Sequence, residues 1–259
     1  KFMLTFKSYI TESKAADQYE KDVADYMTSL GVPASRPKVS AKYADIAIDT
    51  QYRGKKRVWL EVKMNHTDNL GNERVFYNGK KWDGGRDKKS GKLSPLKTFI
   101  VNFLNNSDEA KSFLSDLEKF SGIKDCKVPT TKGGLKDPKA VPLDVMKDFF
   151  KTRNRYIMNK SNVDLGKIVR KHYLQGKAEP AYYLQAGDDF YIFDKQQNPC
   201  NVPNDVPVFK GTGEFKMRVG TRSQFYEVQP EVKVKNMADS KYSVKPGTNK
   251  KNPFESMKQ

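Results

Sequence analysis

The sequence predicts an α+β protein in which a mixed β-sheet is flanked by helices and followed by a C-terminal β-rich region. An amphipathic helical pattern over 13–30 precedes two alternating strand-like segments, and short β-like runs dominate after residue 198. Of the 259 residues, 37% are hydrophobic and 12% aromatic, enough apolar surface for a substantial core. We expect one core domain with basic loop insertions over 1–195, followed by a β-rich extension and basic tail over 196–259.

The first expected element is a helix between Ser13 and Leu30. Gly31 fits the position after the last helical residue, and Pro33 prevents the helix from continuing. Apolar side chains recur at three- and four-residue spacing and form one face of this helix: Ala16, Tyr19, Val23, Tyr26, Met27 and Leu30.

Two strands are expected next, Tyr43–Thr50 (YADIAIDT) and Arg57–Met64 (RVWLEVKM). Both alternate apolar and polar residues, and the polar, glycine-containing link between them has the length of a hairpin turn. Successive side chains of a strand point to opposite faces, so Glu61 and Lys63 share one face of the second strand. Pairing of the two strands predicts that Asp45 lies beside Glu61.

The middle of the chain mixes loops and helices. Residues 65–97 are polar, rich in glycine and basic, which predicts an ordered surface loop or a mobile arm. Thr98–Leu104 fits a buried strand or a helical turn equally well. Ser107 is the expected N-cap of a helix that ends near Phe120, and 121–140 is a second loop.

The remaining elements alternate in type along the chain. Helices are expected over 142–153 and 164–174, and a hairpin over 181–193 with Gly187 in its turn. Four β-like runs follow within 206–234. The segment after Met237 is basic and punctuated by proline and glycine, which predicts a partly disordered tail.

The charge balance indicates a polyanionic partner. The chain has 48 Lys and Arg against 31 Asp and Glu, a formal net charge of +17. This surplus favours nucleic acid, or a membrane surface, but does not distinguish an enzyme from a coating protein. No apolar run approaches the roughly 18 residues of a membrane span, so no membrane partner is expected.

Two basic segments are candidate contacts for nucleic acid. The first lies within 80–97 and the second within 147–177, and the alternative for both is a solvated run of charge. Tyr77, just before the first segment, and Trp82, within it, could stack on exposed bases. The candidate residues are Lys80, Lys81, Arg86, Lys88, Lys89, Arg153 and Arg155.

Cysteine and histidine are too sparse for a disulfide framework, a zinc site or a nucleophilic triad. Cys126 and Cys200 are far apart, which favours a reducing cytoplasm. His66 follows the strand pair and is expected to be a loop histidine, with a phosphate contact as the alternative. His172 lies on an apolar helix face and is expected in the core.

The pair Asp45 and Glu61 points to metal chemistry. Adjacent carboxylates repel each other unless a positive charge lies between them, and Mg²⁺ takes oxygen ligands while keeping several waters. The backbone carbonyl of Val62 offers a further ligand, and Lys63 stands beside the metal. These groups suit metal-assisted phosphodiester hydrolysis. The alternative is an exposed sheet face with cross-strand ion pairs.

The segments YADIAI and WLEVKM resemble the PD-(D/E)xK nuclease superfamily, whose core is a helix followed by a hairpin bearing Asp and then Glu-x-Lys. The resemblance implies that Asp45 and Glu61 are metal ligands and that Lys63 is catalytic. It also implies a restriction-endonuclease-like sheet, which the hairpin over 181–193 would complete. Glu20 matches a helical glutamate that many members place near the metal.

The sequence departs from this family in two places. Ala44 replaces the usual proline, and no clear Gln-x-x-x-Tyr element of the RecB-like branch is present. The resemblance is limited to about residues 13–66.

We therefore expect a Mg²⁺-dependent deoxyribonuclease, with Mn²⁺ as a substitute, that acts on DNA in the cytoplasm of a bacterium or a phage-infected host cell. Such a nuclease could act as a homodimer. Two alternatives stay open, a structure-specific nuclease for branched DNA and a non-catalytic nucleic-acid-binding protein.

Overall fold

The computed structural model describes residues 2–37, 43–71, 73–88, 90–152, 157–221, 224–235 and 237–257. The chain divides into two compact units. Unit 1 comprises 1–68, 170–211 and 236–259, and unit 2 comprises 69–169 and 212–235. The boundary expected after residue 195 falls inside unit 1.

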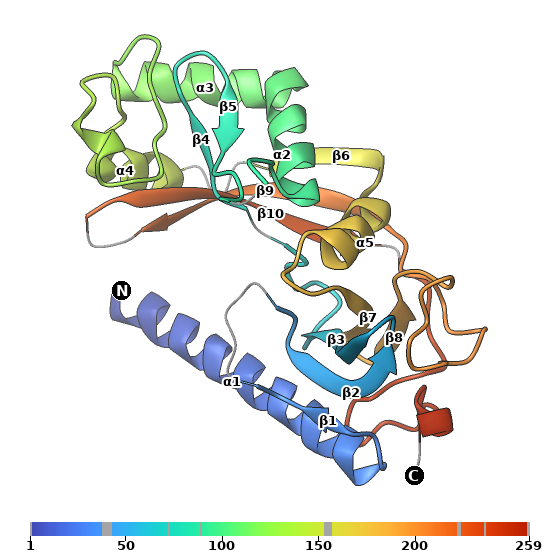
Figure 1. The fold of residues 1–259 in the computed structure, drawn as a ribbon. Helices are drawn as coiled ribbons and strands as arrows, with labels where there is room; N and C mark the ends of the chain where they lie inside the picture. The colour runs from blue at the N-terminus through green and yellow to red at the C-terminus, as the bar shows by residue number, and fades with distance from the viewer. Residues whose placement is uncertain are drawn as a thin grey trace. The chain divides into compact units, whose positions relative to one another are not determined.

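Unit 1 contains a five-stranded mixed sheet of order β1-β2-β3-β7-β8 (Figure 1). The strands β3 and β7 are parallel neighbours, and the other neighbours are antiparallel. The mixed sheet agrees with the expected α+β class, and the hairpin β7–β8 extends it beyond β3. The strands are β1 (Ala34–Ser35), β2 (Ile46–Tyr52), β3 (Lys55–Lys63), β7 (Ala181–Ala186) and β8 (Asp189–Ile192).

The helix α1 (Phe2–Ser29) covers one face of this sheet (Figure 1). Val23 and Met27 of α1 are fully buried in one cluster with Leu60 and other strand residues. The helix begins earlier than its amphipathic pattern predicts and ends where expected, because Gly31 takes a left-handed backbone with φ 80°. The helix α5 (Leu165–Gln175) ends in unit 1, where the Tyr173 side chain contacts Glu61 of β3.

The C-terminal segment, residues 237–257, is packed into unit 1 rather than partly disordered as predicted. Val244 and Phe254 are fully buried, and Phe254 packs edge-on against Tyr183 and Phe190. The buried Gln185 side chain binds this segment through the Ser243 hydroxyl and the Val244 amide. Composition averages over these few buried side chains and therefore does not show that the segment packs. A short 3₁₀ turn, Glu255–Met257, follows.

Unit 2 contains a five-stranded sheet of order β5-β4-β10-β9-β6, antiparallel throughout. The helices α2, α3 and α4 lie on one side of β9 and β10 (Figure 1). The elements are β4 (Val75–Tyr77), β5 (Trp82–Gly84), α2 (Pro95–Asn106), α3 (Asp108–Ser121), a 3₁₀ turn (Gly134–Lys136), α4 (Leu143–Thr152), β6 (Ile157–Asp164), β9 (Thr212–Thr221) and β10 (Tyr226–Lys235).

Local signals explain the helices of unit 2. The open choice over 98–104 is resolved as helix, because the Ser94 side chain accepts from the Lys97 amide and Pro95 starts α2. Ser107 caps α3 as predicted, by accepting from the Ala110 amide. No helix within the described ranges is long and apolar enough to cross a membrane.

The core of unit 2 is aromatic, and it corrects one prediction. Trp82 is 1% exposed and packs against Tyr77 and Phe113, which in turn packs against Phe149. Trp82 is therefore a core residue and is not free to stack on bases. The segment expected as a loop over 65–97 instead contains the short β4–β5 hairpin.

Candidate active site

The structure brings Asp45, Glu61 and Lys63 together at one edge of the unit 1 sheet. Ile46 pairs with Leu60, so Asp45, directly before β2, lies opposite the end of β3. The Asp45 Oδ2 atom accepts a hydrogen bond from the Val62 amide at 2.8 Å. Lys63 Nζ lies 2.5 Å from Glu61 Oε1 and 3.9 Å from Asp45 Oδ2, so the ammonium contacts both carboxylates.

Glu61 is buried on a sheet face that was expected to be polar. Its side chain is 5% exposed, and the Tyr173 hydroxyl donates to its Oε1 atom at 2.9 Å. The other carboxylate oxygen, Oε2, is buried and has no hydrogen-bond partner among the described residues. Trp59, on the same face, is also buried and donates to Glu179. This part of β3 is therefore not an exposed sheet face with surface ion pairs.

Burial and charge set the ionisation of the three groups. Burial raises the pKa of Asp45 to about 7, and the negative charge of Glu61 adds to this effect. Burial alone would also raise the pKa of Glu61, but the positive charges of Lys63 and Lys177 bring it below its ordinary value. Although burial opposes it, the charges of Glu61 and Asp45 raise the pKa of Lys63. The cluster therefore holds a protonated lysine between two carboxylates.

Two residues that sequence reasoning did not single out complete this cluster. Tyr173 is buried, stacks on Phe193 and holds Glu61, while the Lys177 ammonium lies 5.1 Å from the centre of the Tyr173 ring. Tyr173 lies on α5, a helix that was predicted, and Lys177 follows the end of that helix, but periodicity does not show which residue reaches β3. Next to Tyr173, His172 is buried as expected.

Glu20 lies on α1 as predicted but is engaged elsewhere. Its Oε2 atom accepts two hydrogen bonds from Arg36, at 2.6 and 2.8 Å. The Glu20 charge contributes to the raised pKa of Asp45, although burial and Glu61 contribute more. The structure shows no hydrogen bond between Glu20 and the other three residues.

The donor set fits a hard divalent cation. Two carboxylates lie side by side, and the buried Glu61 Oε2 is a negatively charged oxygen that lacks a donor. Mg²⁺ is satisfied by one or two carboxylates because it retains waters as its other ligands. Within the described ranges no group of three or more His, Cys, Asp or Glu side chains gathers around one metal position.

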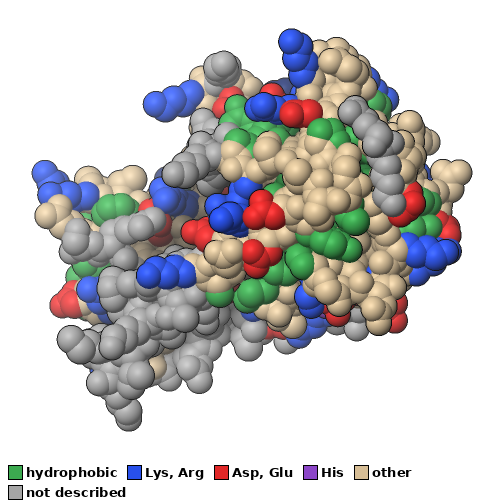
Figure 2. All heavy atoms as spheres, turned by 90° about the horizontal axis from the view of Figure 1, so that it is seen from below, with side chains coloured by type: hydrophobic (Ala, Val, Ile, Leu, Met, Phe, Trp, Pro, Cys, Tyr) green, Lys and Arg blue, Asp and Glu red, His purple; other side chains and the backbone are tan. Residues whose placement is uncertain are grey.

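The predicted nucleic-acid contacts belong to unit 2 where they are described. Lys80 and Lys81 are exposed in the β4–β5 turn, Lys88 is exposed, and Arg86 is exposed and pairs with Asp83 at 3.2 Å. On the face drawn in Figure 2, Lys and Arg side chains are interspersed with Asp and Glu side chains. The other three predicted contacts lie outside the described residues: Lys89, Arg153 and Arg155.

Comparison of the chain with protein-family models, with curated proteins and with solved structures found no match.

Proposed function

We propose that the chain is a divalent-metal-dependent deoxyribonuclease with a restriction-endonuclease-like core, which hydrolyses phosphodiester bonds at Asp45, Glu61 and Lys63. The observation that carries the proposal is the buried Glu61 Oε2 atom, which has no donor among the described residues. An unpaired buried polar group costs about 1–3 kcal/mol, and more when it is charged. A bound cation offsets this cost, and such arrangements cluster at functional sites.

Asp45 and Glu61 are the proposed ligands of Mg²⁺ or Mn²⁺, with the Val62 carbonyl as a further ligand. When bound, such an ion neutralises phosphate charge and lowers the pKa of a coordinated water. Tyr173 and Lys63 orient the Glu61 carboxylate for this task through its Oε1 atom, which leaves Oε2 available.

Lys63 is proposed to act as a charged donor. The raised pKa keeps its side chain an ammonium, which has three N–H donors. Glu61 accepts one of them. The remaining donors are suited to a phosphate oxygen or to the attacking water, and the positive charge stabilises the negative charge that develops at phosphorus.

Cleavage of plasmid DNA with Mg²⁺ or Mn²⁺ tests the proposal. We expect Lys63→Met and Asp45→Asn to reduce the cleavage rate by about 100-fold or more, because the first removes a positive charge that stabilises the transition state and the second removes a proposed metal ligand. Asp49→Asn is the matched control, because Asp49 lies on β2, shortly after Asp45, but forms an exposed ion pair with Arg57.

Two results would refute nuclease activity. One is a wild-type chain that leaves duplex, single-stranded and branched DNA intact, and the other is a Lys63→Met variant that cuts as fast as wild type. DNA binding without any cleavage would favour the non-catalytic nucleic-acid-binding protein.

Thermal unfolding without DNA tests the metal site separately. At pH 8, Mg²⁺ should raise the Tm of wild type but not that of Glu61→Gln, because binding to the folded state alone stabilises it. Without metal, Asp45→Asn should unfold at a higher temperature than wild type, since it removes a buried negative charge next to Glu61. Equal Mg²⁺ effects on wild type and both variants would place metal binding elsewhere.

A further inference from the structure

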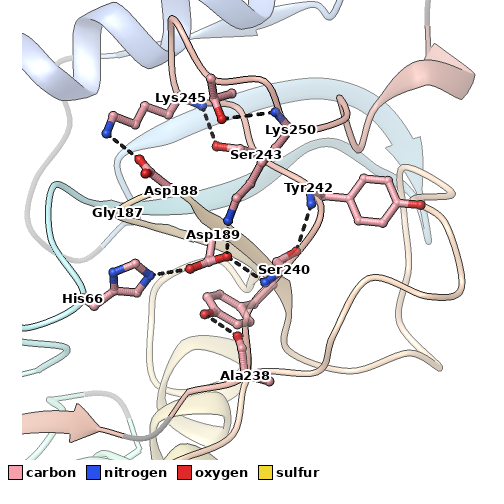
Figure 3. Close-up of polar contacts among 12 residues, drawn as sticks. His66, Gly187, Asp188, Asp189, Ala238, Ser240, Tyr242, Ser243, Lys245 and Lys250 are labelled. Atoms are coloured by element: carbon pink, nitrogen blue, oxygen red, sulfur yellow. Dashed lines mark hydrogen bonds and ion pairs between the residues drawn. The ribbon is translucent and has the colours of Figure 1, made fainter.

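A second polar cluster lies at the β7–β8 turn of unit 1 and is centred on Asp189 (Figure 3). The Asp189 side chain is only 6% exposed. Its Oδ1 atom accepts from the Ser240 amide and from Lys250 Nζ, both at 2.6 Å, and its Oδ2 atom lies 2.6 Å from His66 Nε2. Burial alone would raise the pKa of Asp189, but the bonds from Lys250, Ser240 and His66 bring it below its ordinary value.

The bond to Asp189 orients the His66 ring. An ionised carboxylate only accepts hydrogen bonds, so His66 Nε2 carries the proton and donates it to Asp189. The other ring nitrogen, Nδ1, has no hydrogen bond to any described residue, and Figure 3 shows it turned away from Asp189. The imidazole therefore offers one nitrogen to a partner outside the described chain.

The His66 ring is ordered yet open to solvent. It packs on Gly187, which has φ +54°, and a Cβ atom at that position would lie 2.6 Å from Cε1 and 2.7 Å from Nδ1 of the ring. The His66 side chain nevertheless is 42% exposed. The ring is therefore held in one orientation while part of its surface remains open to a partner.

The cluster shares a sheet edge with the candidate active site. The Gly187 amide donates to the Lys63 carbonyl at 2.9 Å, and His66 follows Lys63 by three residues. Because β3 and β7 are parallel, both end at this edge, and ligands of open α/β sheets bind beyond the carboxyl ends of such strands. Tyr19 of α1 donates to the Gly187 carbonyl and holds the turn in place.

We propose that His66, held by Asp189, hydrogen-bonds a phosphodiester oxygen of the DNA strand next to the phosphate that is cut. This inference rests on the proposed nuclease function. Phosphate oxygens only accept hydrogen bonds, so the contact uses the form of the ring in which Nδ1 also carries a proton, and Asp189 balances the charge of that form. Lys245 is paired with Asp188 and Lys250 with Asp189, so these two ion pairs leave the charge of the cluster balanced apart from His66.

Histidine NMR on the full chain tests this contact, because the sequence contains only two histidines. Wild-type protein is titrated with a short duplex oligodeoxynucleotide in EDTA, so that no bond is cut. The resonance of His66 should shift, and that of buried His172 serves as the internal control and should not. A duplex that binds without shifting the His66 resonance would overturn the contact.

Binding of the same duplex to variants gives a second measurement. His66→Ala should weaken binding about tenfold and reduce the salt slope by about one, as expected for one lost charged phosphate contact. His66→Gln keeps an amide donor without the charge and should recover part of the affinity but not the slope. If His66→Ala lowers the Tm but leaves the Kd for the duplex and the salt slope unchanged, the bond between His66 and Asp189 has only a structural role and the proposal is refuted.

The two proposals fail separately in these experiments. If wild type cuts DNA and His66→Ala binds DNA as tightly as wild type, the histidine contact alone is overturned. Wild type that neither binds nor cuts DNA overturns both.

Discussion

Glu61 is held by two neighbours of different kinds, the Lys63 ammonium on its own strand and the Tyr173 hydroxyl on α5. The ammonium sets the charge of the carboxylate, and the hydroxyl restricts its direction. Under the proposed function Glu61 is a metal ligand, and partners that hold such a ligand are worth about 10- to 100-fold in metal affinity or activity.

Tyr173→Phe isolates the hydroxyl. We expect it to lower the free energy of unfolding by about 1–2 kcal/mol and to reduce both Mg²⁺ affinity and cleavage by about tenfold, because Glu61 loses a donor and its orientation. Urea unfolding and metal titration measure the two effects. Tyr191→Phe is the control, since the Tyr191 hydroxyl donates to the Ala238 carbonyl away from the site. Equal loss of Mg²⁺ affinity in both variants would contradict a specific role for Tyr173.

The sequence sufficed for the pairing of Asp45 with Glu61 and Lys63, because a short hairpin fixes the register and alternation fixes the faces. It did not suffice for Tyr173, which is 112 residues from Glu61 along the chain. Helical periodicity marks a buried face but not its contacts. Glu20 shows the converse limit, because its place on α1 was predictable and its capture by Arg36 was not.

At the scale of elements, the C-terminal segment is held to unit 1 by polar contacts as well as by Phe254. Asp205 accepts hydrogen bonds from Lys241 and from the Tyr242 hydroxyl, the latter at 2.6 Å. These bonds lower the pKa of Asp205 to about 2. The composition of this basic, proline-containing segment predicts disorder, because an average over all its residues hides the few side chains that pack against unit 1.

The Asp205 contacts make the attachment of this segment sensitive to acid. A carboxyl group whose pKa is lower in the folded state stabilises that state above its ordinary pKa, near 3.8, and this contribution is lost as pH falls toward about 2. Asp205→Asn should therefore be less stable than wild type at pH 6, and the difference should shrink as the pH falls below 4. Urea unfolding at several pH values measures this. A difference that stays constant with pH would show that the ionised carboxylate is not responsible.

At the scale of the whole molecule, the surplus of 17 positive charges remains the broadest clue to the partner. The exposed Lys80 and Lys81 in the β4–β5 turn are the described part of it that was expected to contact DNA. Phosphate contacts of this kind are independent of sequence and depend on salt.

Charge reversal tests these two lysines. The double variant Lys80→Glu, Lys81→Glu should weaken DNA binding at all sequences and lower the slope of log K against log salt by about two, one for each lost contact. Fluorescence anisotropy at several salt concentrations measures both. Lys132→Glu with Lys136→Glu is the control, with the same change of net charge at other exposed positions of unit 2. Equal weakening in the two double variants would indicate net charge alone.

The order of units along the chain could not be predicted from local patterns. The expected boundary after residue 195 assumed that neighbours in sequence fold together, but most of unit 2 is inserted between β3 and β7 of unit 1. Trp59 pairs with Ala181 across this insertion. The β2–β3 and β7–β8 hairpins were correctly predicted because their signals are local, whereas pairing over such a distance depends on the packed core.

This insertion governs when the sheet can form during synthesis. The parallel pair β3–β7 joins segments that leave the ribosome far apart in time, and long-range pairing of this kind folds slowly because loop closure precedes the gain from contacts. Phe254 must also emerge before the core of unit 1 is complete. A nascent chain thus exposes Glu61 on an unfinished sheet, and the surroundings of Asp45, Glu61 and Lys63 are complete only after Phe254 has been translated.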